Sequence, residues 1–133
     1  MALPTVGDIL SFDYVVNEAD LASALPIDDE DQYPPVFATS RMIALMELAA
    51  ARMLVPIQAD HELSVGVGVD VQHLAATPEG ETVTASAEYL GTDGKLHRFK
   101  VTLTDASGLA GEGEHTRAIV ATERLMAGID KRR

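Results

Sequence analysis

The feature that most constrains this chain is a helix-forming stretch from Val36 to Leu54 that is apolar on most of its surface. Ala, Leu, Met, Arg and Glu, which favour helices, dominate it, and Thr39–Ser40 and Pro56 mark its expected start and stop. A helix that is apolar nearly all round must be covered by other elements. The strand-like segments that follow it are the available partners, so we predict one long helix wrapped by a sheet.

The rest of the chain predicts one strand before the helix and four after it. Alternating apolar and polar residues place these strands at 10–16, 65–73, 83–89, 97–103 and 109–121. In the first strand after the helix, the valines from Val65 to Val71 are expected to share one face with His73, towards the helix. Asp93–Gly94 predicts a hairpin turn. Residues 122–133 are expected to form either a short polar helix or a frayed tail.

Length and composition limit the classes of protein that the chain can belong to. Its 133 residues predict a single domain, residues 1–133, of the α+β class. The formal net charge of −11 and the pI near 4.6 argue against binding to nucleic acid or to an anionic membrane surface. The chain has no cysteine, which excludes disulfides and thiolate sites. Met1–Pro4 lacks the features of a signal peptide and no later stretch is long enough to cross a bilayer, so we expect a cytoplasmic protein.

The sequence carries no recognised motif for a metal or a nucleotide cofactor. Gly66–Gly68 and Gly111–Gly113 lack the third glycine and the following helix of a dinucleotide-binding loop. The histidines do not have metal-ligand spacing. We therefore expect neither a metal nor a separate cofactor.

Two residues stand out for their chemistry, and each has two interpretations. On the predicted helix, Glu47 lies off the stripe that Arg41 and Arg52 share. Either Glu47 borders a second polar stripe, or it is a carboxylate held against an apolar wall and suited to acid–base work. His73 is either a satisfied core histidine or an inward-facing functional group.

Four segments of the sequence resemble those of one known family. They are Val36–Thr39, Leu45–Glu47, His73–Pro78 and Gly113–Arg117, and they are similar to the matching segments of fluoroacetyl-CoA thioesterase and its relatives. The similarity runs over nearly the whole chain. It implies the hot-dog fold, in which an antiparallel sheet wraps one long central helix, and hydrolysis of an acyl-CoA thioester to a free acid and CoA.

The resemblance also implies roles for individual residues. In that family a Thr, a Glu and a His form the catalytic set, which by motif falls on Thr39, Glu47 and His73. The resemblance further places Gly66 beside the acyl group and Arg117 near the CoA-binding side.

These residue types suit thioester hydrolysis. Backbone N–H groups at the helix start can bind the carbonyl oxygen. Glu47 can attack the carbonyl or activate a water, and His73 can move protons. Thr39 can position the carbonyl or act as a nucleophile. Attack by a side chain and attack by water stay alternatives.

The loop before the helix bears on the choice of acyl group. In the fluoroacetyl enzyme, aromatic residues of this loop form a lid over the acyl pocket, and one of them appears here as Tyr33. The other corresponds roughly to Glu30, which is not aromatic. We therefore expect a short or medium acyl-CoA rather than fluoroacetyl-CoA in particular. A non-catalytic acyl-CoA binding protein and an enoyl-CoA hydratase or dehydratase are the alternatives.

The spacing of Thr39 and Glu47 favours a dimer. They lie about 12 Å apart along one helix, too far for both to touch one carbonyl from the same chain. If two copies of the helix run antiparallel across a two-fold axis, Thr39 of one copy approaches Glu47 of the other. Hot-dog proteins are generally dimers or larger, so the resemblance implies a homodimer or a dimer of dimers.

Overall fold

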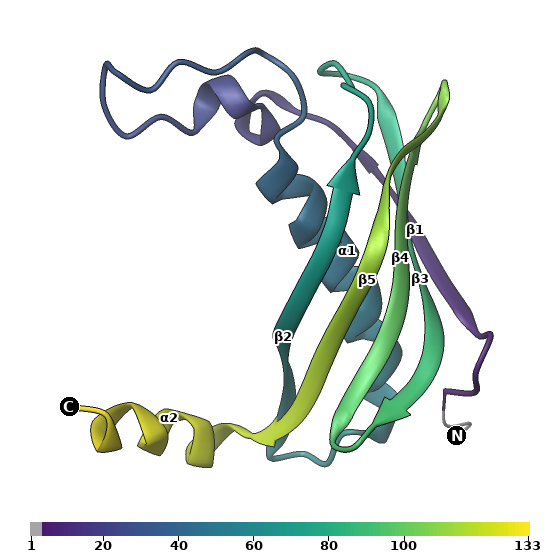
Figure 1. Cartoon of the computed structure of the whole chain (residues 1–133), viewed down its shortest axis with the longest axis vertical. Coiled ribbons are helices and arrows are strands. Elements are labelled where there is room, and N and C mark those ends of the chain that lie inside the picture. The colour runs from purple at the N-terminus through teal and green to yellow at the C-terminus, as the bar shows by residue number, and fades with distance from the viewer. Residues whose placement is uncertain (1–3) are drawn as a thin grey trace.

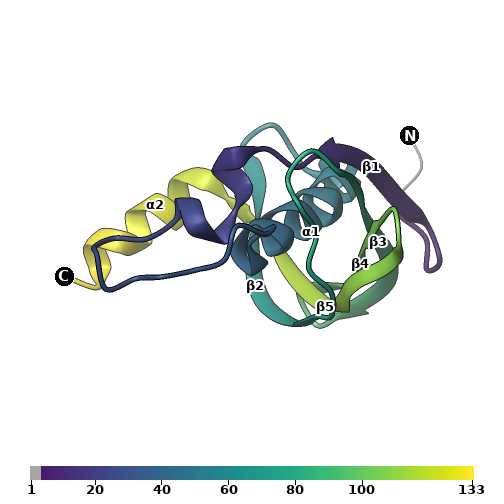
Figure 2. The ribbon, with the colours of Figure 1, turned by 90° about the horizontal axis from the view of Figure 1, so that it is seen from above.

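One long helix lies against a five-stranded antiparallel sheet that curls around it (Figures 1 and 2). The computed structural model describes residues 4–133, so most of the segment considered for a signal peptide, residues 1–3, lies outside the described residues. The strands are β1 (Ile9–Val15), β2 (Glu62–His73), β3 (Thr82–Asp93), β4 (Leu96–Asp105) and β5 (Gly108–Ala121), and the helices are α1 (Thr39–Leu54) and α2 (Thr122–Lys131). Short 3-10 turns are η1 (Glu18–Asp20), η2 (Ala22–Ala24) and η3 (Val55–Ile57).

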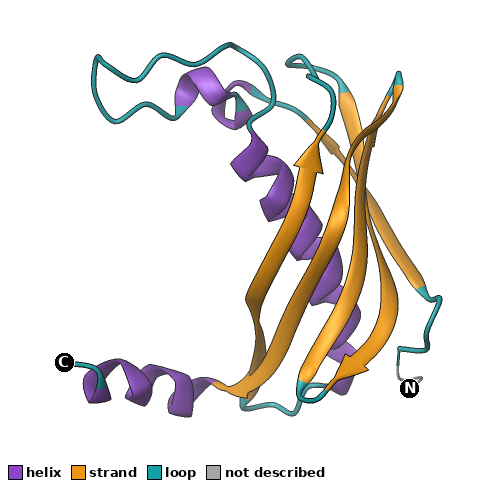
Figure 3. Cartoon of the chain, viewed as in Figure 1, coloured by secondary structure: helices purple, strands orange, loops and turns teal. Residues whose placement is uncertain are grey.

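The strand order across the sheet is β1-β3-β4-β5-β2, which leaves β1 and β2 at its two edges. Each neighbouring pair is antiparallel, and Figure 3 shows α1 crossing the sheet as the central helix. The α+β class and the arrangement of one long helix wrapped by a sheet are therefore confirmed. The hairpin predicted at Asp93–Gly94 joins β3 to β4.

The core forms where α1 packs against the sheet. Its buried side chains are Met42, Leu45, Met46, Ala49, Ala50, Met53 and Leu54. Ala85 and Ala87 of β3 are fully buried, and their small side chains let the helix lie close to the sheet. Burying one Leu or Met side chain contributes about 1.5–3 kcal/mol, so this contact fixes α1 firmly on the sheet.

The helix begins at Thr39, where the sequence placed its start signal, so Val36–Ala38 of the helix-forming stretch lie outside it. The backbone N–H of Phe37 donates to the carbonyl of Thr77 (2.8 Å), and that of Ala38 donates to the carbonyl of Asp20 (2.9 Å). These bonds hold the chain extended up to the helix. Because Ala38 takes the N-cap position, the hydroxyl of Thr39 is not used as a cap.

The expectation that the valines of residues Val65–Val71 share one face is wrong, because β2 contains a β-bulge. Its pairing with β5 shifts between Gly66 and Gly68, which makes Val67 an extra residue. One extra residue reverses the alternation of faces beyond it. Only the valines after the bulge share a face with His73, which points to the helix as expected.

The chain ends in a helix rather than a frayed tail. α2 follows β5 directly and projects away from the sheet (Figure 1). None of the side chains of α2 is buried. None of the helices within residues 4–133 has both the length and the apolar character of a membrane span.

A buried carboxylate fixes the segment that leads into α1. Asp20 is 1% exposed and accepts hydrogen bonds from the hydroxyl of Tyr14 (2.7 Å), the backbone of Asn17 (2.9 Å) and Nε of Arg41 (3.0 Å). Burial alone would raise the pKa of Asp20, but these hydrogen bonds and the charge of Arg41 outweigh burial and hold the pKa below its ordinary value of 3.8. Asp20 is therefore ionised in the folded protein at neutral pH.

We expect Asp20→Ala to lower the free energy of unfolding at pH 7 by about 1.5–3 kcal/mol, because it removes the buried acceptor of the hydrogen bonds from Tyr14, Asn17 and Arg41. Since folding lowers the pKa of Asp20, its contribution is full above pH 3.8 and is lost as the pH falls through the folded pKa. Urea denaturation over a range of pH should show the gap between wild type and variant narrowing in acid. Asp60→Ala, at an exposed turn, is the control, and an equal loss there would contradict this account.

Candidate active site

The first group of candidate residues lies where α1 begins and β2 ends. Thr39 is the first residue of α1 and His73 the last of β2, and Oγ1 of Thr39 lies 2.8 Å from Nδ1 of His73. The other ring nitrogen of His73, Nε2, is buried and has no hydrogen-bond partner within residues 4–133. A buried polar atom without a partner is unfavourable, so a bound molecule that supplies one would be stabilised here.

An open hollow of about 350 Å³ adjoins this pair. Its lining consists of Ala22, Pro34, Val36, Phe37, Ala38, Thr39, His73, Leu74, Ala75 and Ala76. The lining side chains are apolar apart from Thr39 and His73. The backbone N–H groups of Thr39 and Ser40 belong to the first turn of α1, so they have no acceptor inside the helix. Together with the helix dipole, they favour a negative charge at this end of α1.

The second group is centred on Glu47, about two turns further along α1. Oε2 of Glu47 accepts a hydrogen bond from Nη1 of Arg117 at 3.0 Å. Arg117 also donates from Nε to the hydroxyl of Ser64 (2.9 Å) and from Nη2 to the carbonyl of Ser64 (3.0 Å). Arg117 is only 7% exposed, whereas the side chain of Glu47 is 39% exposed. A buried cation anchored on the edge strand therefore holds an accessible carboxylate in one orientation.

His115 packs against this ion pair. Its Nδ1 lies 2.7 Å from the carbonyl oxygen of Gly68, and because a carbonyl only accepts, Nδ1 carries the proton. In the neutral ring, Nε2 then accepts from Nη1 of Arg117 at 3.2 Å, with Oε2 of Glu47 3.8 Å away. Burial and the charge of Arg117 lower the pKa of His115 below 6.5, outweighing its bond to Gly68 and the charge of Glu47. The ring is therefore neutral at neutral pH.

Gly66 leaves the space that the Glu47 carboxylate occupies. A Cβ on Gly66 would collide with Oε2 of Glu47 and come within 3.4 Å of the His115 ring. Gly66 pairs with Arg117 in the sheet, so the glycine and the guanidinium approach the carboxylate from neighbouring strands. A larger residue at this position would force the carboxylate to move.

The structure brings the predicted residues together in two groups rather than one. Thr39 and His73 form the first, while Glu47, Gly66 and Arg117 form the second. The guanidinium of Arg117 is buried beside Glu47, and its expected place near the CoA-binding side stays a prediction. The catalytic and binding roles of these residues stay predictions.

Three further residues, Tyr33, His115 and Ser64, lie at or near the candidate site. Tyr33, the predicted lid residue, lies in the loop before α1 and is 53% exposed. His115 and Ser64 were not predicted as site residues. The period of a strand could have indicated His115, because it lies two residues before Arg117 and so shares its face. No sequence pattern indicated Ser64, because its role comes from a hydrogen bond donated by Arg117 on another strand.

Both site histidines should titrate below pH 6.5. Burial lowers the pKa of His73, and burial is also the main cause of the lowered pKa of His115. An NMR titration of the ring protons, assigned with His73→Gln and His115→Gln, should give both midpoints below 6.5. Because the folded state disfavours protonation of these rings, the free energy of unfolding should fall as the pH drops below 6.5. A midpoint at or above 6.5 for either ring would contradict this environment.

The chain is similar in sequence and in structure to proteins of one known family. The family described as FlK, fluoroacetyl-CoA-specific thioesterase, matches residues 16–123. The chain is 34% identical over 126 residues to the fluoroacetyl-CoA thioesterase of Streptantibioticus cattleyicolor, covering 93% of this chain and 91% of the relative. A solved structure of the fluoroacetyl-CoA thioesterase FlK superposes with a TM-score of 0.91 at 34% identity, over 97% of each chain.

More distant structures share the same fold. A thioesterase superfamily member from Thermus thermophilus has a TM-score of 0.85 at 25% identity, over 98% of this chain and 93% of the other. A hot-dog-like protein from Thermanaerovibrio acidaminovorans has a TM-score of 0.84 at 22% identity, over the same shares of the two chains, and supports the fold alone. The chain therefore belongs to the FlK family of acyl-CoA thioesterases, within the hot-dog thioesterase superfamily.

Proposed function

We propose that this thioesterase hydrolyses a short or medium acyl-CoA, and that Thr39 and His73 of one protomer act with Glu47 of another on the same thioester. The pairing of Thr39 with His73 at the start of α1 is the observation that carries the proposal. This pair combines a hydroxyl, a ring that is neutral at neutral pH and the free N–H groups of a helix start.

Each group has a distinct task in the proposed reaction. The N–H groups near Thr39 and Ser40 bind the carbonyl oxygen as negative charge develops on it. Glu47 either attacks the carbonyl carbon or takes a proton from an attacking water. If Glu47 attacks, cleavage of the C–S bond leaves an acyl-Glu47 anhydride, and His73 takes a proton from the water that hydrolyses this anhydride and gives it to the thiolate of CoA. If water attacks, the proton that the water loses to Glu47 passes through His73 to the departing thiolate. Arg117 and His115 keep the carboxylate of Glu47 oriented.

The space beside Glu47 favours a small acyl group. A hollow of about 210 Å³ is lined there by Ala44, Glu47, Leu48, Ala51 and Arg117. Tyr33 and Glu30 of the preceding loop are both exposed, and Glu30 stands where the resemblance places a second aromatic lid residue. A charged residue there does not suit a dry pocket that selects fluorine. Fluoroacetyl-CoA is therefore one candidate among short acyl-CoAs.

A two-fold dimer accounts for the separation of the two groups of residues. The edge strand β2 has backbone groups free to pair, and its Val67 and Val69 are 56% and 45% exposed. Leu48 on the adjacent face of α1 is 39% exposed. A copy added antiparallel at β2 would cover these side chains and set the two α1 helices antiparallel. Thr39 of one copy would then approach Glu47 of the other, in a dimer or a dimer of dimers. The cytoplasmic location expected from the sequence suits an acyl-CoA substrate and stays a prediction.

The proposed activity can be tested by thiol release from acetyl-, fluoroacetyl-, longer and aromatic acyl-CoAs. We expect the highest kcat/KM among the short and medium acyl groups, because the hollow beside Glu47 is small. Glu47→Gln and His73→Ala should each lower kcat by about 10²–10⁴-fold, since each removes a group that moves protons or attacks. Glu79→Gln and His61→Ala remove the same chemical groups at exposed positions and serve as controls.

Other results would point to other functions. Binding of CoA without release of thiol from any ester would favour a binding protein. Addition of water to an enoyl-CoA would favour a hydratase. Release of thiol that is unaffected by both site variants would contradict the assigned residues.

A further inference from the structure

Two segments project from the same side of the molecule, at opposite ends of the sheet. One is α2, and the other is the loop of residues 25–35 that leads to α1, here called the pre-helix loop (Figures 1 and 2). Neither segment contributes a side chain to the hydrophobic core. Both leave the body on the side of β2, the edge strand at which the proposed dimer forms.

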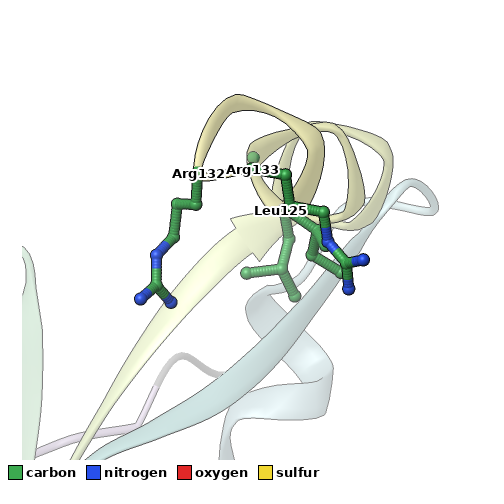
Figure 4. A pocket seen from close by; sticks show the side chains of 5 residues that line it. Leu125, Arg132 and Arg133 are labelled. Atoms are coloured by element: carbon green, nitrogen blue, oxygen red, sulfur yellow. The ribbon is translucent and has the colours of Figure 1, made fainter.

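One face of α2 is apolar and carries positive charge. Leu125, Met126 and Ile129 are 43%, 56% and 42% exposed, which is unusual for three apolar residues on one short helix. A hollow of about 560 Å³ on this helix is lined by Leu125, Gly128, Ile129, Arg132 and Arg133. Figure 4 shows Leu125 between the side chains of Arg132 and Arg133. Among the ion pairs within residues 4–133, none includes either arginine.

The pre-helix loop has the complementary character. Leu25, Ile27 and Tyr33 are 42%, 94% and 53% exposed, and the four consecutive residues of Asp28–Asp31 are acidic. Asp31 accepts hydrogen bonds from two backbone N–H groups of the loop, and Asp28 accepts one. These bonds shape the loop. The carboxylates of Asp29 and Glu30 belong to no hydrogen bond or ion pair within residues 4–133, and they are exposed.

The symmetry of the proposed dimer brings these two surfaces together. A two-fold axis that sets the α1 helices antiparallel exchanges the two ends of the sheet. The pre-helix loop of the second copy is thereby carried to the end from which α2 of the first copy projects. Because both segments project on the side of β2, in this dimer they point towards each other at that end, and the same arrangement repeats at the other end.

We propose that α2 of each protomer docks against the pre-helix loop of its partner in a homodimer. The apolar stripe of Leu125, Met126 and Ile129 covers the exposed apolar residues of the loop, while Arg132 and Arg133 face Asp29 and Glu30. This inference rests on the proposed dimer but goes beyond the sharing of Thr39 and Glu47.

The docking has a consequence for the acyl-CoA site. The pre-helix loop carries Tyr33, and its Pro34 lines the hollow beside Thr39 and His73. A loop held by α2 of the partner keeps that wall in place. The wall of each hollow beside Thr39 and His73 thus depends on α2 of the other protomer, which acts on the site by positioning the pre-helix loop.

Crosslinking between single-cysteine variants tests the contact, because the natural chain has no cysteine. Asp29→Cys and Arg132→Cys chains with tags of different size are mixed, exchanged into heterodimers and treated with a short bismaleimide. The pre-helix loop and α2 lie at opposite ends of the sheet in one protomer (Figure 1), so a covalent heterodimer reports the contact between chains. Asp93→Cys paired with Arg132→Cys is the matched control. The two-fold axis places the partner's β3–β4 turn at the opposite end of the sheet from α2, so this pair should not crosslink.

Charge exchange gives a second, independent measurement. The charges can be reversed on α2 alone, with Arg132→Glu and Arg133→Glu, or on the pre-helix loop alone, with Asp29→Lys and Glu30→Lys. Either change should weaken dimerisation at low salt by about 10-fold, since several exposed ion pairs are lost together. Combining both reversals should restore the affinity measured by sedimentation. The rescue distinguishes a direct contact from a general loss of stability.

The outcomes separate this inference from the proposed function. A selective crosslink with charge rescue supports docking. An active dimer without the crosslink or the rescue overturns docking and leaves the thioesterase proposal intact. A raised KM for acyl-CoA, with dimer affinity unchanged by the arginine reversals, assigns Arg132 and Arg133 to the phosphates of CoA instead. A monomeric active enzyme overturns both the docking and the shared site.

Discussion

The hydrogen bond between Arg117 and Glu47 is the interaction on which the candidate site depends most. A guanidinium buried to this degree needs several acceptors, and Arg117 finds them on Ser64 of β2, His115 of β5 and Glu47 of α1. The pair therefore joins the edge strand, its neighbour and the central helix at one point. Because the cation is fixed from the strand side, the partly exposed carboxylate keeps one orientation. Gly66 leaves the room that this orientation requires.

The same helix carries a second chemical centre at its start. Hydrogen bonds to Thr77 and Asp20 hold the preceding chain extended, so α1 begins at Thr39 and leaves its hydroxyl available to His73. The tight packing of α1 on β3 then fixes the spacing between this end and Glu47. Because the helix is rigid, Thr39 and Glu47 of one protomer cannot approach each other. We therefore propose that a second copy of the helix, running in the opposite direction, brings Glu47 to Thr39 and His73.

Much of the fold and part of the site could be predicted from the sequence. The apolar stretch containing Glu47 gave the central helix, and strand periodicity placed His73 towards it. Periodicity failed within Val65–Val71, because a β-bulge depends on pairing with another strand, which one strand's pattern does not reveal. The part of His115 in orienting Glu47 was missed for a similar reason. Its role comes from the Gly68 carbonyl and Arg117, which the folded sheet brings beside it.

The central claim is that one thioester is acted on by Thr39 and His73 of one protomer and by Glu47 of the other. Mixing Thr39→Ala and Glu47→Gln chains, each inactive alone, tests it most directly, with heterodimers isolated by two different tags. One of the two sites in such a heterodimer has both mutations and the other has neither. The account predicts close to half of the wild-type kcat per heterodimer. Confirmed heterodimers that stay as inactive as the parent variants would contradict it.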